Sequence, residues 1–272
     1  MVKDLLKQVV YPIFKSRPDF LIVGAQKAGT TALYRYLEQH HQLLQNKSWK
    51  EVHYFDDVKN YQKGIVWYLG HFPYKIEKKN RLVFEATPEY LYYDHIPKLI
   101  KQDLGEMKIM IILRNPAERA YSAWKMYNSF QNNPHEHLRE IYDDRTFAES
   151  IYQEMNNELD IDNEPYHYIG RGKYVYQIEN YLEYFAKDSI LVLDFNNFKK
   201  NLKSMLDQVC NFLEIERFTR GEIDVFETQK HNVGKKQEKS NSDQATLELL
   251  KNHFIPYNKK LYELLNYRFG WS

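Results

Sequence analysis

Residues 24–31, with the sequence GAQKAGTT, gather two glycines, a lysine and two threonines in one short segment. They follow the apolar run Phe20–Val23 and precede an amphipathic stretch, so a strand should turn into a helix here. Such a turn points consecutive main-chain N–H groups and a helix N-terminus at an anion. Gly24 and Gly29 permit backbone conformations that side chains would block, and Lys27 adds a positive charge. We therefore predict an anion-binding loop.

A second candidate anion site follows another apolar run, in the segment LRNPAERAYSAW. Arg114 leaves the end of a predicted strand, an Asn-Pro pair turns the chain, and a helix should begin near Ala117. A guanidinium and a hydroxyl held in this way can bind a terminal phosphate. Arg114, Arg119 and Ser122 supply these groups, so the two segments together predict a nucleotide ligand with two separate anionic ends.

A kinase-like chemistry is the alternative reading of the loop. The loop departs from the G-x-x-x-x-G-K-[ST] pattern because Lys27 precedes the second glycine. A kinase or ATPase should also supply a strand-terminal aspartate for magnesium, and Asp194 ends the run ILVLD. Against this reading, the run before Asn115 ends in a cation, and a site that neutralises its ligand with lysine and arginine needs no metal. A phosphotransferase or nucleotide hydrolase that uses ATP and magnesium stays open.

The elements that position these residues follow from the hydrophobic pattern. Short apolar runs are typical of parallel strands covered on both faces, and they occur at Phe20–Val23, Leu82–Phe84, Lys108–Leu113 and Ile190–Leu193. Helical periodicity predicts helices over Thr30–His40, Ile96–Asp103, Ala117–Phe130, Phe147–Met155, Val175–Phe185, Leu202–Leu213 and Asp243–Leu265. The alternation predicts an α/β fold in which residues 1–272 form a single domain, a central parallel sheet flanked by helices.

Three segments of this domain stand apart in composition. We expect an amphipathic helix over 1–17, an acidic loop or lid over 131–165 and a basic loop over 227–242. The acidic segment carries a net charge of −8, so the rest of the chain carries +9. A basic remainder suits an anionic ligand.

Composition excludes several protein classes. Hydrophobic residues make up 43% and charged residues 28% of the chain, which argues against disorder. The sequence contains neither a signal-peptide pattern nor a run of membrane-spanning length, so we expect a cytoplasmic protein. The single cysteine, Cys210, stands in an apolar pattern typical of a core helix. His135 and His137 lack the further ligands of a metal site, and we expect no bound metal.

Taken together, the motifs resemble those of sulfotransferases that use 3′-phosphoadenosine 5′-phosphosulfate (PAPS), and more closely the heparan sulfate type than the hydroxysteroid type. The motifs occur in family order along nearly the whole chain: QKAGTTALYRYL, KEVHYFD, FEATPEYL, LRNPAERAYSAW, GRGKYVYQIENYLEYF and PYNKKLYELLNYRFGW. The resemblance implies a sulfotransferase fold similar to that of the P-loop kinases and suggests a bacterial relative of these enzymes.

The resemblance also implies roles for individual residues in binding PAPS. The loop residues that would cradle the 5′-phosphosulfate are Gln26, Lys27, Ala28, Gly29, Thr30 and Thr31. Arg114 and Ser122 would hold the 3′-phosphate that distinguishes this donor from ATP. The residues that would close over the nucleotide or line its cleft are Gly234, Lys235, Lys236 and Tyr174.

For catalysis, the resemblance implies that Glu51 in KEVHYFD is the general base that removes the acceptor proton. His53 is the reserve base, because residues two apart share a face of an extended segment. Lys27 would stabilise the charge that develops on the leaving oxygen.

Two departures bear on the acceptor. The animal heparan enzymes usually have a lysine where this chain has Ala86, and their disulfide-closed late loop cannot form with one cysteine. We therefore expect a different acceptor, either a small molecule or a carbohydrate, and no nucleic acid partner. The role of Glu85 and the oligomeric state are left unassigned. A catalytically silent PAPS- or glycan-binding module is a third reading, in which Glu51→Ala would leave function intact.

Overall fold

The computed structural model divides the chain into two compact units. The first comprises Met1–Leu113 with Glu179–Asn232, and the second comprises Arg114–Ile178 with Val233–Ser272. The residues that the structure describes are 11, 13–47, 50–158, 165–228 and 239–271. Most of the predicted helix over 1–17 and of the predicted basic loop over 227–242 falls outside these residues.

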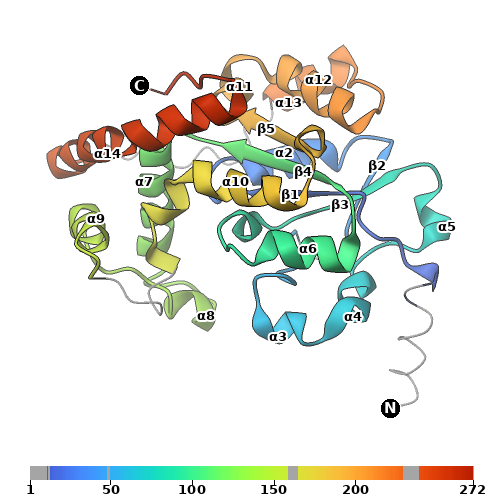
Figure 1. Cartoon of the computed structure of the whole chain (residues 1–272), viewed down its shortest axis with the longest axis horizontal. Helices are drawn as coiled ribbons and strands as arrows, with labels where there is room; N and C mark the ends of the chain where they lie inside the picture. Colours follow the sequence, from blue (N-terminus) through green and yellow to red (C-terminus); the bar gives the residue numbers. More distant parts are fainter. Residues whose placement is uncertain (1–10, 12, 48–49, 159–164, 229–238, 272) are drawn as a thin grey trace. The chain divides into compact units, whose positions relative to one another are not determined.

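A five-stranded parallel sheet forms the centre of the first unit (Figure 1). Its strands are β1 (Phe20–Gly24), β2 (Leu43–Gln45), β3 (Leu82–Ala86), β4 (Lys108–Leu113) and β5 (Ile190–Asp194). They are ordered β2-β3-β1-β4-β5, and every pairing is parallel. The four predicted strands are confirmed, and β1 and β4 are buried almost throughout, as their uninterrupted apolar sequences require. β2, a three-residue edge strand, was not predicted.

Parallel pairing brings the carboxyl ends of the strands to one edge of the sheet. In the register, Leu21 pairs with Glu85 of β3, Ile22 pairs with Met110 of β4, and Leu113 pairs with Asp194. In open α/β sheets, ligands bind outside this edge. The segments that follow β1, β3, β4 and β5 all begin there.

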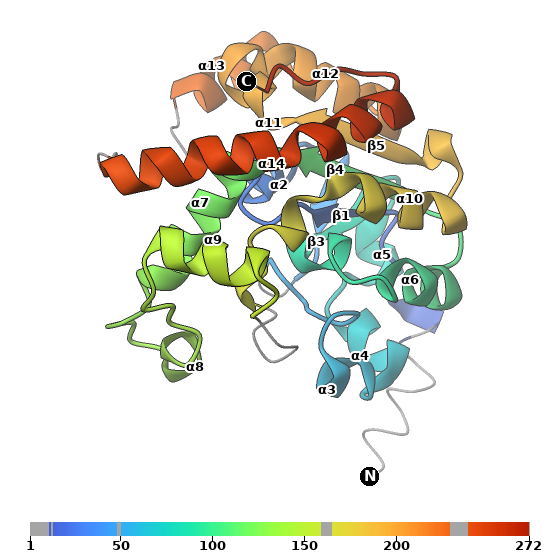
Figure 2. The ribbon, with the colours of Figure 1, turned by 60° about the vertical axis from the view of Figure 1, so that its left-hand side comes forward.

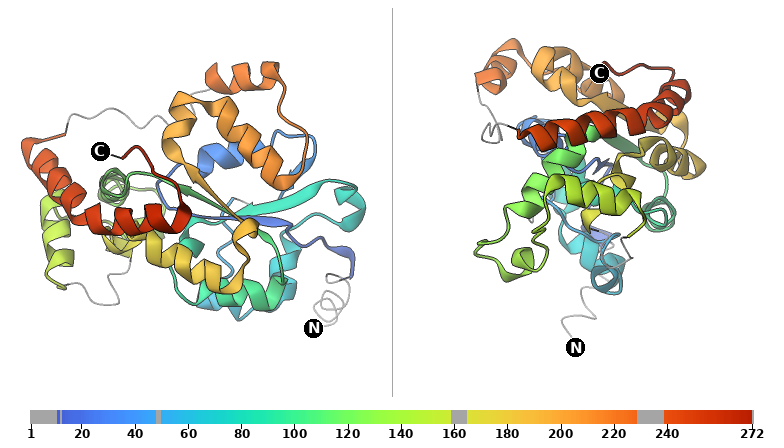
Figure 3. Two further views of the ribbon diagram at one scale, coloured as in Figure 1. Left: turned by 45° about the horizontal axis from the view of Figure 1, so that its top comes forward. Right: turned by 90° about the vertical axis from the view of Figure 1, so that its left-hand side faces the viewer.

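Helices cover both faces of the sheet (Figure 3, left). One face carries α2 (Thr30–Leu37), α11 (Phe195–Lys200), α12 (Leu202–Leu213) and α13 (Arg220–Thr228). The ring of Tyr36 packs there against Phe226, with centroids 4.7 Å apart. The other face carries η1 (Pro88–Leu91), α6 (Ile96–Leu104) and the end of α10 (Tyr174–Tyr184). The Tyr181 hydroxyl donates there to the carbonyl of Tyr90, at 3.0 Å.

Five described α-helices of the first unit were not predicted: α11 and α13, given above, and α3 (Val58–Tyr61), α4 (Gly64–Gly70) and α5 (Lys75–Lys78). All except α13 have seven residues or fewer, too few for a helical period to show in the sequence. The carboxylate of Asp57 accepts the N–H of Asn60 and begins α3 directly after the KEVHYFD segment. This short turn therefore follows the predicted base.

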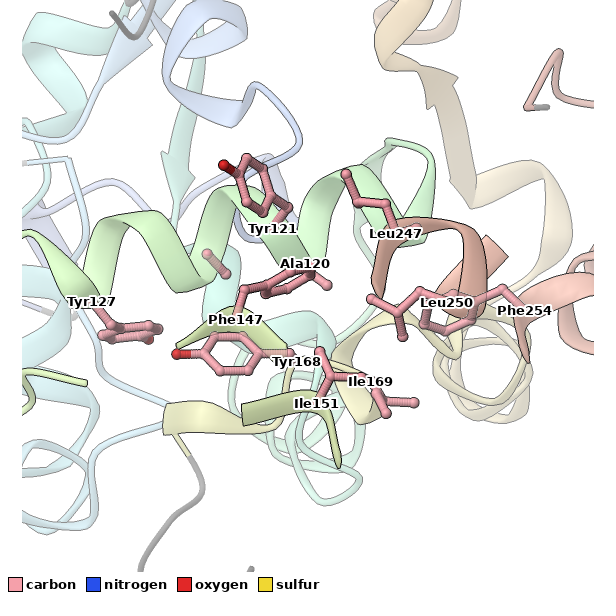
Figure 4. Close-up of a cluster of buried hydrophobic side chains, with 12 residues drawn as sticks. Ala120, Tyr121, Tyr127, Phe147, Ile151, Tyr168, Ile169, Leu247, Leu250 and Phe254 are labelled. Carbon is pink, nitrogen blue, oxygen red and sulfur yellow. The ribbon is translucent and has the colours of Figure 1, made fainter. Parts of the chain in front are cut away.

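The second unit is helical (Figure 2). Its elements are α7 (Pro116–Asn128), α8 (Glu136–Arg139), α9 (Phe147–Met155), η3 (Gly170–Gly172) and α14 (Asn241–Leu265). Apolar side chains from α7, α9 and α14 meet in one core around Ala120, Phe147 and Leu250 (Figure 4). The segment 131–165, predicted as an acidic loop or lid, contains α8 and α9 among its described residues.

Capping residues explain where the predicted helices begin. Thr146 accepts the N–H of Glu149, whose carboxylate accepts the N–H of Thr146, so α9 begins at Phe147 as predicted. Ser240 and Asp243 form the same box, so α14 begins at residue 241, two residues before the predicted start. Among the described residues, no helix is both long and apolar enough to cross a bilayer.

Candidate functional site

The loop between β1 and α2 has the main-chain geometry of an anion-binding turn. Lys27 and Gly29 both adopt left-handed conformations, with φ of 65° and 100°. Gly29 is the N-cap of α2 and has no side chain with which to cap the helix, and the first turn of α2 contains no acidic residue. The positive end of the helix dipole therefore faces the loop without a neutralising carboxylate of its own.

Two glycines of this loop are required by close contacts. A Cβ on Gly24 would lie 2.5 Å from the Cβ of Leu91 in η1. A Cβ on Gly29 would lie 2.7 Å from the ring of Phe195 in α11. Because real Cβ atoms do not approach this closely, these neighbours hold the loop in place only if both positions stay glycine.

The other predicted loop residues differ in burial. Gln26 donates from Nε2 to Glu89 Oε1 at 2.7 Å, which ties the loop to η1. Ala28 and Thr30 are buried, whereas Lys27 and Thr31 are half-buried. The loop thus combines fixed main-chain groups with a lysine and a threonine that keep solvent contact.

The KEVHYFD segment forms an ionic cluster in the same unit. His53 Nδ1 lies 2.7 Å from Asp56 Oδ2, and His53 Nε2 lies 3.5 Å from Glu51 Oε2. Lys50 Nζ donates to the other Glu51 oxygen at 2.5 Å. Asp56 was not singled out from the sequence, although its place three residues after His53 was a usable signal.

The cluster sets the charge states of both predicted bases. Burial disfavours the imidazolium of His53, but the hydrogen bonds to Asp56 and Glu51 outweigh it and raise the pKa of His53 to about 10. Burial also disfavours the Glu51 carboxylate, but hydrogen bonds from His53 and the charge of Lys50 prevail and lower its pKa to about 2. At neutral pH, His53 is therefore protonated and Glu51 is ionised.

Glu85, at the end of β3, lies completely buried beside this cluster. Its carboxylate accepts hydrogen bonds from three hydroxyls, those of Tyr68, Thr87 and Tyr90. Burial raises the pKa of Glu85, because three neutral donors offset only part of the lost hydration. The unassigned glutamate of the sequence is thus the centre of a hydroxyl cluster.

The turn η1 contacts both the loop and the base segment. Glu89 accepts from Gln26, and Leu91 packs against Gly24. On the other side, the hydroxyl of Tyr90 accepts the N–H of Tyr54 at 3.0 Å. The first unit therefore brings the loop and the ionic cluster to one shared support.

The second unit carries the other predicted anion site. Arg114 Nη2 lies 3.7 Å from Glu118 Oε2, and Lys239 Nζ donates to Glu118 Oε1 at 2.7 Å. Ser122 is half-buried and stands one helical turn after Glu118, on the same side of α7. Glu118 thus lies between two cations, beside the residues predicted to bind a phosphate. Gly234, Lys235 and Lys236 lie outside the described residues.

Tyr174 and Arg119 support this second site from within the core. The Tyr174 hydroxyl donates to the main-chain carbonyl of Arg114 at 2.9 Å, and its ring is buried against Trp271. The guanidinium of Arg119 is completely buried and donates to the carbonyl of Tyr168. Arg119, grouped with Arg114 and Ser122 in the sequence, therefore has no surface to offer a ligand. A nucleotide contact by Tyr174 stays a prediction.

The side chains that bear on the alternative readings are also placed. Asp194 ends β5 as predicted, and its carboxylate accepts the N–H of Asn196 to cap α11. Within the described part of the chain, no three histidine, cysteine, aspartate or glutamate side chains group as metal ligands would. Cys210 is a buried thiol of α12, and burial raises its pKa to about 11, which agrees with the predicted core role.

The sequence and the fold are similar to those of known sulfotransferases. The sequence model of a family described as "Sulfotransferase domain" matches residues 17–260, which include parts of both units. The chain is 29% identical over 222 residues to bifunctional heparan sulfate N-deacetylase/N-sulfotransferase 4 of Mus musculus, a match that covers 78% of this chain and 24% of that protein. The chain thus spans about a quarter of the length of this relative.

Two solved structures share the fold. A sulfotransferase from Alicyclobacillus acidocaldarius superposes with a TM-score of 0.66 at 23% identity, over 93% of this chain and 98% of that one. Mouse SULT7A1, solved in complex with PAP, superposes with a TM-score of 0.52 at 18% identity, over 86% and 73% of the two chains. At these identities, the likeness concerns the fold alone.

Proposed function

The chain belongs to the sulfotransferase domain family, and on that premise we propose that it transfers a sulfuryl group from PAPS to a hydroxyl or amine of a glycan or small-molecule acceptor. The observation that carries the proposal is the double contact of η1. Gln26 of the anion loop bonds to Glu89, and main-chain N–H groups of the Glu51–Asp56 segment bond to Thr87 and Tyr90. The predicted donor loop and the predicted base segment thus share one short turn as their support.

In this proposal, the two anion sites bind the two ends of the donor. The loop residues Gln26 to Thr31 take the 5′-phosphosulfate with main-chain N–H groups and Lys27. Arg114 and Ser122 take the 3′-phosphate, and binding displaces Glu118 from Arg114 because two anions compete for one guanidinium. The predicted nucleotide contacts of Gly234, Lys235 and Lys236 lie outside the described residues and stay predictions. Lysine and arginine neutralise the donor, so we propose transfer that is independent of metal.

The reaction is an in-line displacement at sulfur. The acceptor oxygen or nitrogen forms a bond to sulfur while the bond between sulfur and the bridging oxygen of the 5′-phosphate breaks. The acceptor proton passes to Glu51, and adenosine 3′,5′-bisphosphate leaves. Charge develops on the bridging oxygen, where Lys27 and the N–H groups of the loop stabilise it.

Glu51 is the better candidate for the base. Because its pKa is about 10, His53 is already protonated at neutral pH and cannot accept the acceptor's proton. Glu51 is ionised, and Asp56 holds the imidazolium that in turn holds Glu51. Glu51 is a weak base while Lys50 and His53 both contact it, so proton transfer falls late, when the acceptor has become acidic.

Calorimetric titration with adenosine 3′,5′-bisphosphate, against ATP with and without magnesium, tests the donor class. We expect binding of the bisphosphate without metal, weakened about tenfold or more by Arg114→Ala, since a charged hydrogen bond is worth about 1.5–3 kcal/mol. Ser122→Ala should have a smaller effect. Arg268→Ala, an exposed arginine of the same unit, is the matched control. Magnesium-dependent ATP binding without bisphosphate binding would establish the phosphotransferase instead, and loss of activity in Asp194→Asn would support it.

Turnover of PAPS with a panel of acceptors tests the catalytic residues. We expect Glu51→Gln to lower kcat by about 10²–10⁴-fold while bisphosphate affinity is unchanged. Lys27→Ala should lower kcat by about 10²–10³-fold, with exposed Lys59→Ala as its control. Unchanged turnover in Glu51→Gln would show that Glu51 is not the general base.

The cytoplasmic location and the lack of a nucleic acid partner stay predictions.

A further inference from the structure

Glu85 has no place in the transfer step, yet it is a completely buried carboxylate of the first unit. Its hydrogen bonds come from neutral hydroxyls: Thr87 Oγ1 donates to Oε1 at 2.5 Å, the Tyr90 hydroxyl donates to the same oxygen at 3.1 Å, and the Tyr68 hydroxyl donates to Oε2. Keeping a carboxylate out of water in this way is unfavourable. An apolar residue at this strand end would avoid the free energy needed to remove a carboxylate from water, so Glu85 is not explained by stability.

Two of the three hydroxyls also accept hydrogen bonds from the segment that contains Glu51 and His53. Thr87 Oγ1 accepts the main-chain N–H of Val52 at 3.2 Å, and the Tyr90 hydroxyl accepts the main-chain N–H of Tyr54 at 3.0 Å. A hydroxyl has one proton to donate. Because each hydroxyl receives an N–H, its own proton is directed to an acceptor on the other side, and Glu85 Oε1 is that acceptor for both.

The two N–H groups held in this way belong to the residues on either side of His53. His53 itself has a φ of 51°, a left-handed conformation that is unfavourable for a residue with a side chain. Such a conformation persists only where neighbouring contacts enforce it. Glu51 directly precedes Val52, so the same two hydrogen bonds fix the backbone from which both Glu51 and His53 project.

We propose that Glu85 is a positioning residue for the Glu51–His53 pair, acting through the hydroxyls of Thr87 and Tyr90 on the peptide N–H groups of Val52 and Tyr54. The inference rests on the proposed function, because that function gives Glu51 its task. Glu85 touches neither donor nor acceptor, and it acts only through the relay.

Tyr68 provides an internal control for this inference. It is as buried as Tyr90, and its hydroxyl bonds to the same carboxylate. It receives none of the N–H groups of the 52–54 segment, which go to Thr87 and Tyr90. Tyr68→Phe and Tyr90→Phe therefore delete the same group from the same cluster, and only the second breaks the relay.

The test compares these two variants in steady-state turnover of PAPS. We expect Tyr90→Phe to lower kcat about tenfold, because small misplacements of catalytic groups are costly, with unchanged affinity for adenosine 3′,5′-bisphosphate. Tyr68→Phe should stay within about twofold of the wild type. Thr87→Val, which keeps the shape of the side chain, should resemble Tyr90→Phe.

Glu85→Gln supplies the rescue. An amide oxygen can still accept from Thr87 and Tyr90, while the amide nitrogen can donate to the oxygen of Tyr68. We therefore expect Glu85→Gln to retain kcat within about threefold, whereas Glu85→Leu loses about tenfold or more. Equal losses of kcat in Tyr68→Phe and Tyr90→Phe, each in proportion to its loss of thermal stability, would overturn the inference.

A second readout separates this inference from the proposed function. The His53 resonance, assigned with His53→Gln, can be titrated by NMR in each variant without any donor or acceptor. We expect Tyr90→Phe to shift the His53 titration and Tyr68→Phe to leave it unchanged. Wild-type protein that does not transfer sulfuryl groups would refute the function while this titration still tests the positioning; identical His53 titrations in both variants would refute the positioning.

Discussion

Each unit contains a buried carboxylate that accepts hydrogen bonds from hydroxyls. Among the described residues, the carboxylate of the second unit is also paired with a cation, and that of the first unit is not. Asp143 of the second unit accepts from Tyr168 and Ser150, and Arg145 binds both of its oxygens, each at 2.8 Å. Glu85 of the first unit has three hydroxyls and no arginine or lysine among its described partners. Both side chains are almost fully enclosed.

The difference separates a stabilising carboxylate from a positioning one. The Asp143–Arg145 pair joins α9 to Tyr168, so its bonds serve the packing of the second unit. Glu85 is linked, through Thr87 and Tyr90, to the backbone beside His53, in the segment that carries both predicted bases. A carboxylate without a counter-ion contributes little to stability, so the benefit of Glu85 should appear in the site.

The largest effect should come from breaking the ion pair of the second unit. Asp143→Ala leaves the half-buried guanidinium of Arg145 without its main partner, and we expect a loss of about 3–5 kcal/mol in the free energy of unfolding. Urea denaturation measures this loss. Asp144→Ala, at the exposed neighbouring position, is the control, and equal losses in both variants would show that the pair is not structural.

A smaller loss is expected when the carboxylate of the first unit is removed. Glu85→Ala leaves three hydroxyls without their acceptor but also relieves the burial of a charge. We expect the free energy of unfolding to fall by about 2 kcal/mol. The comparison fails if Glu85→Ala destabilises more than Asp143→Ala does in the same urea titration.

The pH dependence of stability should sharpen the contrast further. Burial raises the pKa of Glu85 above 4.5, so the folded protein binds this proton more tightly than the unfolded chain does. The stability of the wild type should therefore fall, relative to Glu85→Gln, as the pH rises from 4.5 through the folded pKa. Parallel stability curves for the two proteins would contradict the raised pKa.

The smallest effect should come from an exposed pair. Lys203 and Asp207 are one helical turn apart in α12 and their charged atoms lie 2.6 Å apart, with 48% of the Lys203 side chain exposed. Asp207→Asn should change the free energy of unfolding by less than about 0.5 kcal/mol. A loss close to that of Asp143→Ala would mean that burial does not set the strength of these pairs.

Much of this architecture could be read from the sequence. The strands and the amphipathic helices are long or periodic enough to show, and the loop at 24–31 is contiguous, so spacing alone identifies it. β2 was not predicted because three residues are too few to show a hydrophobic period. α11 was not predicted because it has only six residues and begins at the Asp194 cap, directly after β5.

The hydroxyl relay shows what a linear pattern cannot reveal. Tyr68, Glu85 and Tyr90 come from three elements, and only the sheet register and the turn η1 bring their oxygens together. Arg119 shows the converse. Its place between Arg114 and Ser122 suggested a ligand, whereas the helix directs it into the core.

The close contact between Gly29 and Phe195 limits which residues can occupy these two positions together. Because the ring of Phe195 fills the space where a Cβ would stand, variation at position 29 is linked to variation at position 195, far away in the sequence. Gly29→Ala should therefore be rescued in part by Phe195→Leu, which removes the ring nearest to the added Cβ. The rescue stays partial, since the left-handed backbone persists in the double variant. A library randomised at both positions should return correlated pairs rather than independent tolerances.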